Sequence, residues 1–222
     1  MPVYNRAYCI KDSIESVVSQ THSKWKLLIV DDGSTDGLAA VVEPFLQDER
    51  ITMTRIEQGG VAKARNMGLK KAKGKYVFYL DSDNKWYPDY LKNMIVFMET
   101  KSLFAAYSGV RIVDDEKAIG FYGEPFDWNE CLELNYIDIN SFGHRNDDFV
   151  KQIMFDENLK RLVDWDFILA ITANQPTAYA PFLGVEYYDG QKGSRITFTE
   201  HLGEEINSVI KQIQQKHTNK KS

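Results

Sequence analysis

Apolar and polar residues form alternating blocks along the first hundred positions, and each block predicts one strand or helix. Two continuous apolar runs, 26–30 and 76–80, have the pattern of strands buried on both faces of a parallel sheet. A shorter strand is expected at 51–56. Apolar residues at helical spacing predict helices that include positions 14–18, 38–45, 62–72 and 91–98. This alternation indicates an α/β fold with an open, mostly parallel sheet flanked by helices.

The pattern changes after residue 103. Strands are expected at 105–113 and 118–122 around a polar turn at 114–116, whereas residues 127–146 are irregular and aromatic. A helix-forming stretch at 159–171, a strand at 182–188 and a terminal helix at 206–213 follow, and a basic tail ends the chain. We expect one domain with two functional halves, 1–103 and a smaller mixed half at 104–200, followed by a C-terminal helix and tail at 201–222.

Composition narrows the class of protein. With 222 residues, of which 43% are hydrophobic, the chain can bury a core, so wholesale disorder is excluded. A formal net charge of −5 disfavours a nucleic-acid partner. Cys9 and Cys131 are far apart in sequence, so neither a disulfide framework nor a zinc knuckle is expected. No apolar run is long enough to span a membrane, and a cytoplasmic setting is expected. A membrane-surface contact is an alternative use of the basic tail.

Two acidic clusters follow the two strongest predicted strands. Asp31 and Asp32 end one strand, and Asp81 and Asp83 end the other. Ligands of open α/β sheets bind beyond the carboxyl ends of the strands, so these clusters mark a candidate ligand edge. Carboxylates at Asp-x-Asp spacing suit a hard divalent cation, which would also relieve their mutual repulsion. The alternative is a turn rich in Asp and Asn that merely caps the next helix.

Four segments in a fixed order resemble family 2 glycosyltransferases with the GT-A fold, of bacterial type. The segments are Pro2-Val3-Tyr4-Asn5-Arg6, Val30-Asp31-Asp32-Gly33-Ser34-Thr35-Asp36, Gly59-Gly60-Val61-Ala62-Lys63-Ala64-Arg65-Asn66, and Gly74 through Asn84 with Asp81-Ser82-Asp83. Residues 136–145 and 155–166 are similar to the acceptor-side half of bacterial members. The sequence matches neither a phosphate-cradling P-loop nor a Gly-x-Gly-x-x-Gly fingerprint.

The resemblance implies a nucleotide-sugar donor site in the first half. Tyr4 and Asp32 would hold the base, and Pro2 and Val3 would shape its pocket. Further nucleotide-side candidates are Asp31, Lys63, Arg65 and Ser82. The resemblance also implies that Asp81 and Asp83 form a metal-binding DxD motif for Mn²⁺ or Mg²⁺, with Asp83 as the direct ligand. The donor would be a nucleotide-diphosphate sugar, with UDP favoured over GDP.

On the acceptor side, the resemblance aligns Asp164 with the aspartate that serves as catalytic base, and Asp166 competes for that role. Inversion at the anomeric carbon requires a carboxylate that takes the acceptor proton. The sequence has no Gln-x-x-Arg-Trp motif, which favours transfer of a single sugar. His144 is interpreted as a structural residue, and core packing is the expected use of three aromatic residues, Trp128, Tyr136 and Trp165.

Family members begin with a full buried strand, whereas only Met1-Pro2-Val3 precedes Tyr4 here. This departure leads us to expect a shortened version of a longer protein. Two alternatives to an active transferase therefore stay open. One is a non-catalytic nucleotide-binding remnant, and the other is a sugar nucleotidyltransferase. The expected acceptor is a surface glycan or its lipid-linked precursor, reached at the inner face of the membrane.

Overall fold

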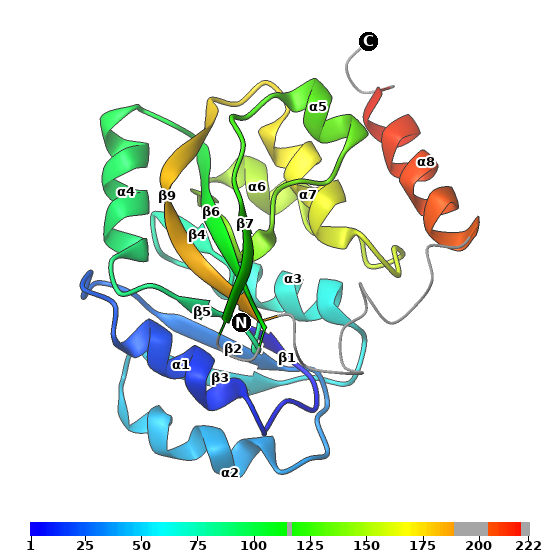
Figure 1. The fold of residues 1–222 in the computed structure, drawn as a ribbon. Coiled ribbons are helices and arrows are strands. Elements are labelled where there is room, and N and C mark those ends of the chain that lie inside the picture. Colours follow the sequence, from blue (N-terminus) through cyan, green and yellow to red (C-terminus); the bar gives the residue numbers. More distant parts are fainter. Residues whose placement is uncertain (115–116, 189–203, 219–222) are drawn as a thin grey trace.

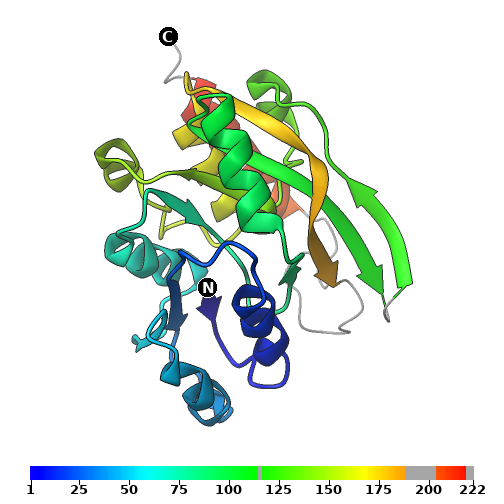
Figure 2. The same ribbon diagram turned by 90° about the vertical axis from the view of Figure 1, so that its left-hand side faces the viewer.

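Two β-sheets and the helices around them make up the computed structural model, which describes residues 1–114, 117–188 and 204–218 (Figures 1 and 2). Three features expected from the sequence therefore lie partly or wholly outside the described residues. These are positions 115–116 of the polar turn, the boundary at residue 200 and the end of the basic tail.

The first sheet contains three parallel strands in the order β1 (Pro2–Val3), β2 (Leu27–Asp31) and β3 (Ile51–Arg55). Pro2 pairs with Val30, and the carbonyl oxygen of Met1 accepts a hydrogen bond from the Val30 amide at 2.9 Å. Two helices, α1 (Ile10–Val18) and α2 (Leu38–Val42), lie on one side of this sheet, and α3 (Val61–Lys71) lies on the other (Figure 1). The predicted strands and helices of this region are confirmed.

The helix expected at 38–45 ends earlier, because α2 stops at Val42 and the chain continues as a 3-10 turn, η1 (Glu43–Gln47). Pro44 near the start of η1 has no amide hydrogen to donate, so an α-helix cannot run through it without losing a bond.

The second sheet has the strand order β4-β8-β6-β9-β5, and β7 pairs with β6. Among its strands, β6 and β9 run parallel, and the other neighbouring pairs are antiparallel. Helix α4 (Tyr90–Thr100) packs against β6 and β9. The strands are β4 (Tyr76–Phe78), β5 (Lys85–Trp86), β6 (Ala105–Asp114), β7 (Lys117–Tyr122), β8 (Phe142–Arg145) and β9 (Thr177–Tyr188).

The strand predicted at 76–80 is shorter than expected and does not extend the parallel sheet. β4 ends at Phe78 and pairs antiparallel with β8, where Phe78 lies opposite Gly143. The ring of Phe78 fills the space beside Gly143, where an added Cβ would lie 2.2 Å from Cε1 of that ring. An apolar run indicates that a strand is buried on both faces, but it does not indicate which strand lies next to it. The α/β class is confirmed. The expectation that 76–80 belongs to the parallel sheet is corrected, because β4 pairs antiparallel with β8.

The stretch expected to be irregular at 127–146 instead contains short ordered elements, and a further short helix follows it. Helix α5 (Trp128–Glu133) and the 3-10 turn η2 (Ile139–Ser141), within the stretch, and helix α6 (Asp148–Ile153), after it, each begin after an aspartate that accepts backbone N–H groups. These capping residues are Asp127, Asp138 and Asp147. Helices this short contain too few apolar residues to show a helical period, so the capping aspartate is the sequence feature that marks where each begins. Helix α7 (Val163–Thr172) begins later than predicted, and β9 begins earlier, at Thr177.

Two hydrophobic cores hold the chain together, and each draws on both sides of residue 103. The first contains Val3 and Val110, and the second contains Ala62 and Trp165. The boundary at 103 therefore remains a prediction about function, since packing is continuous across it. Among the described residues, no helix combines the length and apolar character needed to cross a membrane.

The terminal helix α8 (Glu204–Thr218) is docked on α7 by buried charges. Asp166 is 2% exposed and accepts hydrogen bonds from Lys216 Nζ and His217 Nε2, both at 2.8 Å. Burial alone would raise the pKa of Asp166, but the bonds from His217 and Lys216 outweigh that effect and lower it. Ile213 beside them is fully buried.

We predict that Asp166→Ala lowers the free energy of unfolding by about 3 kcal/mol, because it leaves Lys216 and the buried His217 without their shared acceptor. Urea unfolding followed by circular dichroism measures this loss. Asp148→Ala is the control, since that carboxylate is 91% exposed and pairs with Lys151 on the surface. Equal stability of the two variants would contradict the anchoring role.

Candidate functional site

The loops that follow β1 and β2 are bonded to each other. The Asn5 amide donates to Ser34 Oγ at 3.0 Å, and the Thr35 amide donates to Asn5 Oδ1 at 2.8 Å. Asn5 adopts a φ of 50°, a left-handed conformation that asparagine tolerates better than most residues. The Tyr4 side chain, next to this turn, is 40% exposed. The two loops thus form one rigid ledge that leaves Tyr4 open to a ligand.

Asp32 ties the same ledge to the start of α3. Its two carboxylate oxygens accept hydrogen bonds from the amides of Gly59 and Gly60, each at 2.8 Å. Gly60 has a φ of 89°, and an added Cβ on Gly59 would lie 2.2 Å from Cδ of Lys63. The φ of Gly60 favours glycine there, and Lys63 lies across Gly59 with its ammonium donating to the Glu57 carbonyl at 3.1 Å.

Asp31 is almost fully buried, and both of its carboxylate oxygens have partners. It accepts from the Ser34 amide at 2.8 Å and from Arg55 Nη1 at 2.8 Å. These bonds close the 31–36 loop, so the position has a clear structural use. Its role as a nucleotide ligand stays a prediction, as do the roles of Pro2, Val3 and Lys63.

Asp81 lies in a network of polar side chains at the centre of the site. Its Oδ1 accepts from Arg65 Nη2 at 2.9 Å, and its amide donates to Asn140 Oδ1 at 2.6 Å. Asn140 Nδ2 reaches Asp81 Oδ2 at 3.3 Å and Asp138 Oδ1 at 2.8 Å. Arg65 is 7% exposed, so its charge is held inside the protein beside this carboxylate.

Asp83 is the second acid of the motif and points toward the first loop. Arg6 Nε lies 3.8 Å from Asp83 Oδ2, and the Asp83 side chain is 18% exposed. Ser82 between the two acids is buried, and its carbonyl accepts from the Cys9 thiol at 3.4 Å. Burial raises the pKa of that thiol to about 11, and the charge of Asp83 adds to the effect. Cys9 and Cys131 are both free thiols.

The expectation that a metal would relieve repulsion between Asp81 and Asp83 stays a prediction. Each carboxylate already has a guanidinium partner, Arg65 for Asp81 and Arg6 for Asp83. These pairs offset part of the repulsion within the protein.

Three contributors were missed by the sequence analysis: Arg6, Asp138 and Asn140. Burial raises the pKa of Asp138 to about 6, and the charges of Asp81 and Asp164 add to the rise. The sequence feature that could have identified Asp138 and Asn140 is the Asp-Ile-Asn triplet at 138–140. It lies inside the segment 136–145, which resembles the acceptor-side half of family 2 glycosyltransferases.

The two acids at the start of α7 face different surroundings. Residues two apart on a helix point to different sides, so Asp166 faces α8 while the partly exposed Asp164 faces the Asp81 network. Burial would lower the pKa of Arg65, but the charges of Asp81 and Asp164 outweigh it and raise that pKa. The charge of Asp164 also contributes to the raised pKa of Asp138. The charge of Asp164 thus acts on two residues of the Asp81 network, whereas the Asp166 carboxylate is bonded to α8.

His144 and three aromatic residues have structural partners. His144 is fully buried, with Nε2 bonded to the Tyr79 hydroxyl and Nδ1 to the Arg145 carbonyl, both at 2.8 Å. Trp165 Nε1 donates to the Cys131 carbonyl at 2.6 Å, and Trp128 Nε1 donates to Leu169 at 3.2 Å. The Tyr136 hydroxyl donates to the Asp127 carbonyl at 3.0 Å. These contacts agree with the structural interpretation of all four.

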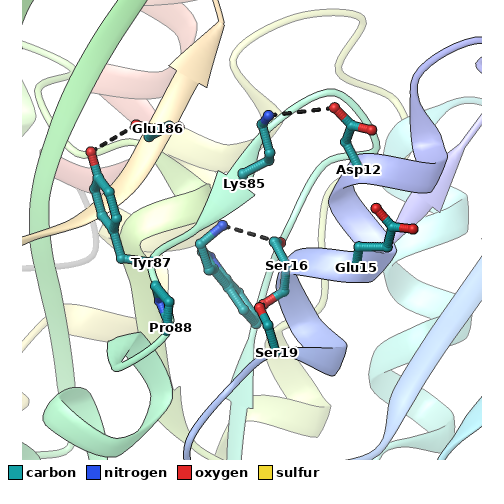
Figure 3. Close-up of a pocket in the computed structure, with 9 residues that line it drawn as sticks. Asp12, Glu15, Ser16, Ser19, Lys85, Tyr87, Pro88 and Glu186 are labelled. Carbon is teal, nitrogen blue, oxygen red and sulfur yellow. Dashed lines mark hydrogen bonds and ion pairs between the residues drawn. The ribbon is translucent and has the colours of Figure 1, made fainter.

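Two cavities have linings that do not include Asp81 or Asp83. One, of about 470 Å³, is bounded by α1, β5 and β9, and Figure 3 shows two of the polar pairs in its lining. Lys85 Nζ is 3.4 Å from Asp12 Oδ2, and the Tyr87 hydroxyl donates to Glu186 at 2.9 Å (Figure 3). The other, of about 500 Å³, is lined in part by Asp166 and Lys216.

The order of these loops matches one known family. The family model described as glycosyl transferase family 2 matches residues 1–159. The chain belongs to glycosyl transferase family 2.

Relatives of this family 2 chain include proteins of bacterial surface-glycan synthesis. TuaG of Bacillus subtilis (strain 168), named for teichuronic acid biosynthesis, is 40% identical over 114 residues, which cover 50% of this chain and 45% of TuaG. WfaP of Escherichia coli, a UDP-Glc:alpha-D-GlcNAc-diphosphoundecaprenol beta-1,3-glucosyltransferase, is 35% identical over 136 residues, 61% of this chain and 54% of WfaP. The chain thus spans about half the length of these two relatives.

Solved structures agree on the GT-A fold. Residues 1–349 of Staphylococcus aureus TarS in complex with UDP-GlcNAc align with a TM-score of 0.79 at 21% identity, covering 96% of this chain and 63% of that one. The mannosyltransferase PcManGT of Pyrobaculum calidifontis, in complex with GDP-Man and Mn²⁺, aligns with a TM-score of 0.64 at 20% identity, covering 86% and 56%.

The fit of the family 2 site to a divalent cation depends on the oxygen ligands that its side chains offer. Among the residues that the structure describes, no three His, Cys, Asp or Glu side chains form a group that could hold a metal alone. Mg²⁺ and Mn²⁺ favour oxygen ligands, and at phosphate sites one or two carboxylates suffice because the substrate phosphates and waters complete the shell. The partly exposed carboxylates of Asp81 and Asp83 supply that kind of donor, so the residues present fit a metal delivered with a diphosphate.

Because burial lowers the pKa of His144 to about 4, below its ordinary value of 6.5, the folded protein keeps this ring neutral while the unfolded chain takes up a proton. Stability should therefore fall as the pH drops from 6.5 toward 4, by about 2 kcal/mol at pH 5 from this residue. We predict that His144→Gln flattens this part of the pH dependence in urea unfolding between pH 7.5 and 5, whereas His22→Gln keeps it. An unchanged slope in His144→Gln would contradict the prediction.

Proposed function

We propose that this chain is a metal-dependent, inverting glycosyltransferase that moves one sugar from a nucleotide-diphosphate sugar to a hydroxyl acceptor in surface-glycan synthesis. One observation carries the proposal. Asp81, one of the two acids implied for the metal, pairs with the buried guanidinium of Arg65, and the charge of the implied base, Asp164, acts on the same guanidinium. A donor site and a proton acceptor in one place are what transfer at an anomeric carbon requires.

On the donor side, we assign the nucleotide to the ledge formed by the first two loops. Tyr4 offers an exposed ring for stacking on a base, and Pro2 and the buried Val3 support the chain just before it. Asp32 faces this ledge, and each of its oxygens retains a lone pair after accepting one glycine amide. Lys63 and Arg65 are positioned on the diphosphate side. UDP is proposed over GDP because the names of WfaP and the TarS complex specify UDP donors.

The metal is assigned to Asp83 and Asp81, as Mn²⁺ or Mg²⁺. Four carboxylates, those of Asp81, Asp83, Asp138 and Asp164, surround two guanidinium groups, so the site carries a net negative charge. A bare diphosphate would be repelled, whereas a diphosphate that carries a divalent cation is nearly neutral. When bound, the metal would act as a Lewis acid that stabilises charge on the leaving diphosphate.

Asp164 is the proposed base. It is partly exposed at the start of α7 and close enough to Arg65 to influence its pKa. Its carboxylate would accept the proton of the acceptor hydroxyl as that oxygen attacks the anomeric carbon from the face opposite the nucleotide. Asp166 is the weaker candidate, because both of its oxygens accept hydrogen bonds from side chains of α8, Lys216 and His217.

The acceptor is proposed to be a glycan or a lipid-linked precursor, reached from the cytoplasmic side at the membrane surface. WfaP is named for a diphosphoundecaprenol-linked acceptor, and this relationship is the support for the proposed acceptor class.

Ser82 is assigned to the donor side only through its position between Asp81 and Asp83.

The first test is calorimetric titration of UDP and of GDP into the chain, with Mn²⁺ present and then chelated. We predict Mn²⁺-dependent binding of UDP, and a loss of about 100-fold or more in Asp83→Ala because the direct oxygen ligand is removed. Asp12→Ala is the matched control, since that exposed acid pairs with Lys85 in the neighbouring cavity. Release of nucleotide from UDP-glucose or UDP-GlcNAc supports a transferase, pyrophosphorolysis supports a nucleotidyltransferase, and binding without turnover supports a remnant.

The second test separates donor binding from chemistry. We predict that Asp164→Asn binds UDP as the wild type does but lowers the rate of sugar transfer by on the order of 10²-fold or more, because the amide cannot accept the proton. Asp166→Asn should instead lower stability and leave the transfer rate of the folded protein nearly unchanged. Unchanged transfer in Asp164→Asn would assign the base to another residue.

A further inference from the structure

Asn140 holds the turn at 81–84 from both ends. Its side-chain oxygen accepts the Asp81 amide at 2.6 Å, at the start of the turn. Its backbone carbonyl accepts Trp86 Nε1 at 2.8 Å, just beyond the end of the turn. Asn140 is 1% exposed and Trp86 is 8% exposed, so both contacts are shielded from water. One residue of the 139–141 turn thus fixes the segment that carries Asp81 and Asp83.

The orientation of the Asn140 amide follows from the chemistry of its neighbours. The Asp81 amide can only donate, so it must face Oδ1. The carboxylates of Asp81 and Asp138, when ionised, can only accept, so Nδ2 must face them, at 3.3 and 2.8 Å. A reversed amide would place an oxygen against two carboxylates and an NH₂ group against an N–H. The side chain therefore has one stable orientation.

Asp138 is the anchor of this arrangement. Its Oδ1 accepts both the Asn140 backbone amide at 2.7 Å and Asn140 Nδ2 at 2.8 Å, so Asn140 is bonded to it twice. The Asp138 carbonyl accepts from the Ser141 amide at 3.0 Å and from Ser141 Oγ at 2.8 Å, which closes the turn from the other side. Residue 138 thus fixes residue 140, and residue 140 fixes residue 81.

We propose that Asn140, oriented by Asp138, is a positioning residue for the metal and diphosphate end of the donor site. It sets the direction of the Asp81 carboxylate and the path of the turn that carries Asp83. This inference rests on the proposed function, because it assigns a role within the same site. It adds two residues to that site: Asn140, which is 59 positions from Asp81 in sequence, and its neighbour Asp138.

The physical basis is the small number of constraints on Asp81. Among the described residues, its carboxylate accepts one further hydrogen bond, from the Arg65 guanidinium on Oδ1. Without Asn140, Oδ2 would have no donor and the Asp81 amide would have no acceptor, so the side chain and the turn could both rotate. Residues that orient metal ligands typically change metal affinity 10- to 100-fold when they are removed.

The experiment measures the Mn²⁺ concentration needed for half-maximal UDP binding, together with amide hydrogen exchange of residues 79–86 in the metal-free protein. We predict that Asn140→Ala raises the half-maximal Mn²⁺ concentration about 10- to 100-fold and speeds exchange in that segment. Asp138→Ala should act in the same direction. Asp138→Asn should stay near the wild type, because its amide oxygen can accept both bonds from Asn140.

Asn146→Ala is the matched control. Its Nδ2 donates to the carbonyls of Ala72 at 3.1 Å and Gly74 at 2.9 Å, so it also ties two segments together, but at the far end of β8. It should leave both the Mn²⁺ requirement and the exchange of residues 79–86 unchanged. All variants are compared below their melting transitions, so that a general loss of stability does not enter.

The outcomes separate the two proposals. A wild-type chain that binds neither UDP nor GDP with Mn²⁺ overturns the proposed function and this inference with it. Metal-dependent binding in the wild type with the same Mn²⁺ requirement in Asn140→Ala overturns only the positioning role. A shift in Asn146→Ala as large as that in Asn140→Ala would also overturn it, because the effect would then be general.

Discussion

The buried guanidinium of Arg65 is the constraint on which the rest of the site depends. A charge that is removed from water is costly unless opposite charges surround it, and Arg65 meets this need with Asp81 at 2.9 Å and the nearby Asp164. Asp81 comes from the turn after β4, and Asp164 comes from the start of α7. One cation on α3 therefore holds together the acid of the first half and the acid of the second.

Arg65 also explains how two hydrophobic cores can meet at a polar seam. The guanidinium carbon lies 5.6 Å from the centre of the Phe155 ring, and Phe155 stacks on Phe167 at 3.9 Å between ring centres. The charged end of Arg65 faces the acids while its flank contacts aromatic side chains. Arg65 is thus placed between the acid Asp81 and a pair of stacked aromatic rings.

Much of the fold follows from local sequence, and the parts that do not are set by distant contacts. The strands at 27–31 and 51–55 could be predicted because the first is a continuous apolar run and the second alternates apolar and polar residues. The partner of β4 could not, because pairing with β8 depends on a glycine at 143 that accepts the Phe78 ring. The start of α5 was missed because a two-turn helix has too few apolar positions to show a period.

The same distinction applies to the candidate site. Asp81 and Asp83 stand out in sequence because they follow an apolar run directly, and the resemblance singles out Asp164. The different surroundings of Asp164 and Asp166 depend on Lys216 and His217, which lie some fifty positions later. The role of Asn140 likewise requires a contact across 59 positions, which no local pattern reveals.

The raised pKa of Asp138 shows that burial and neighbouring acids both act against a charge at this position. Burial and the charges of Asp81 and Asp164 raise its pKa to about 6, so the ionised form that orients Asn140 is disfavoured by its own surroundings. An apolar side chain at 138 would relieve that repulsion, but it could not accept the two bonds from Asn140, which require an oxygen acceptor. The fold therefore tolerates repulsion among its acids in exchange for a fixed ligand geometry. A divalent cation bound at Asp81 and Asp83 would reduce the repulsion, so metal binding and the order of the 138–140 turn should reinforce each other.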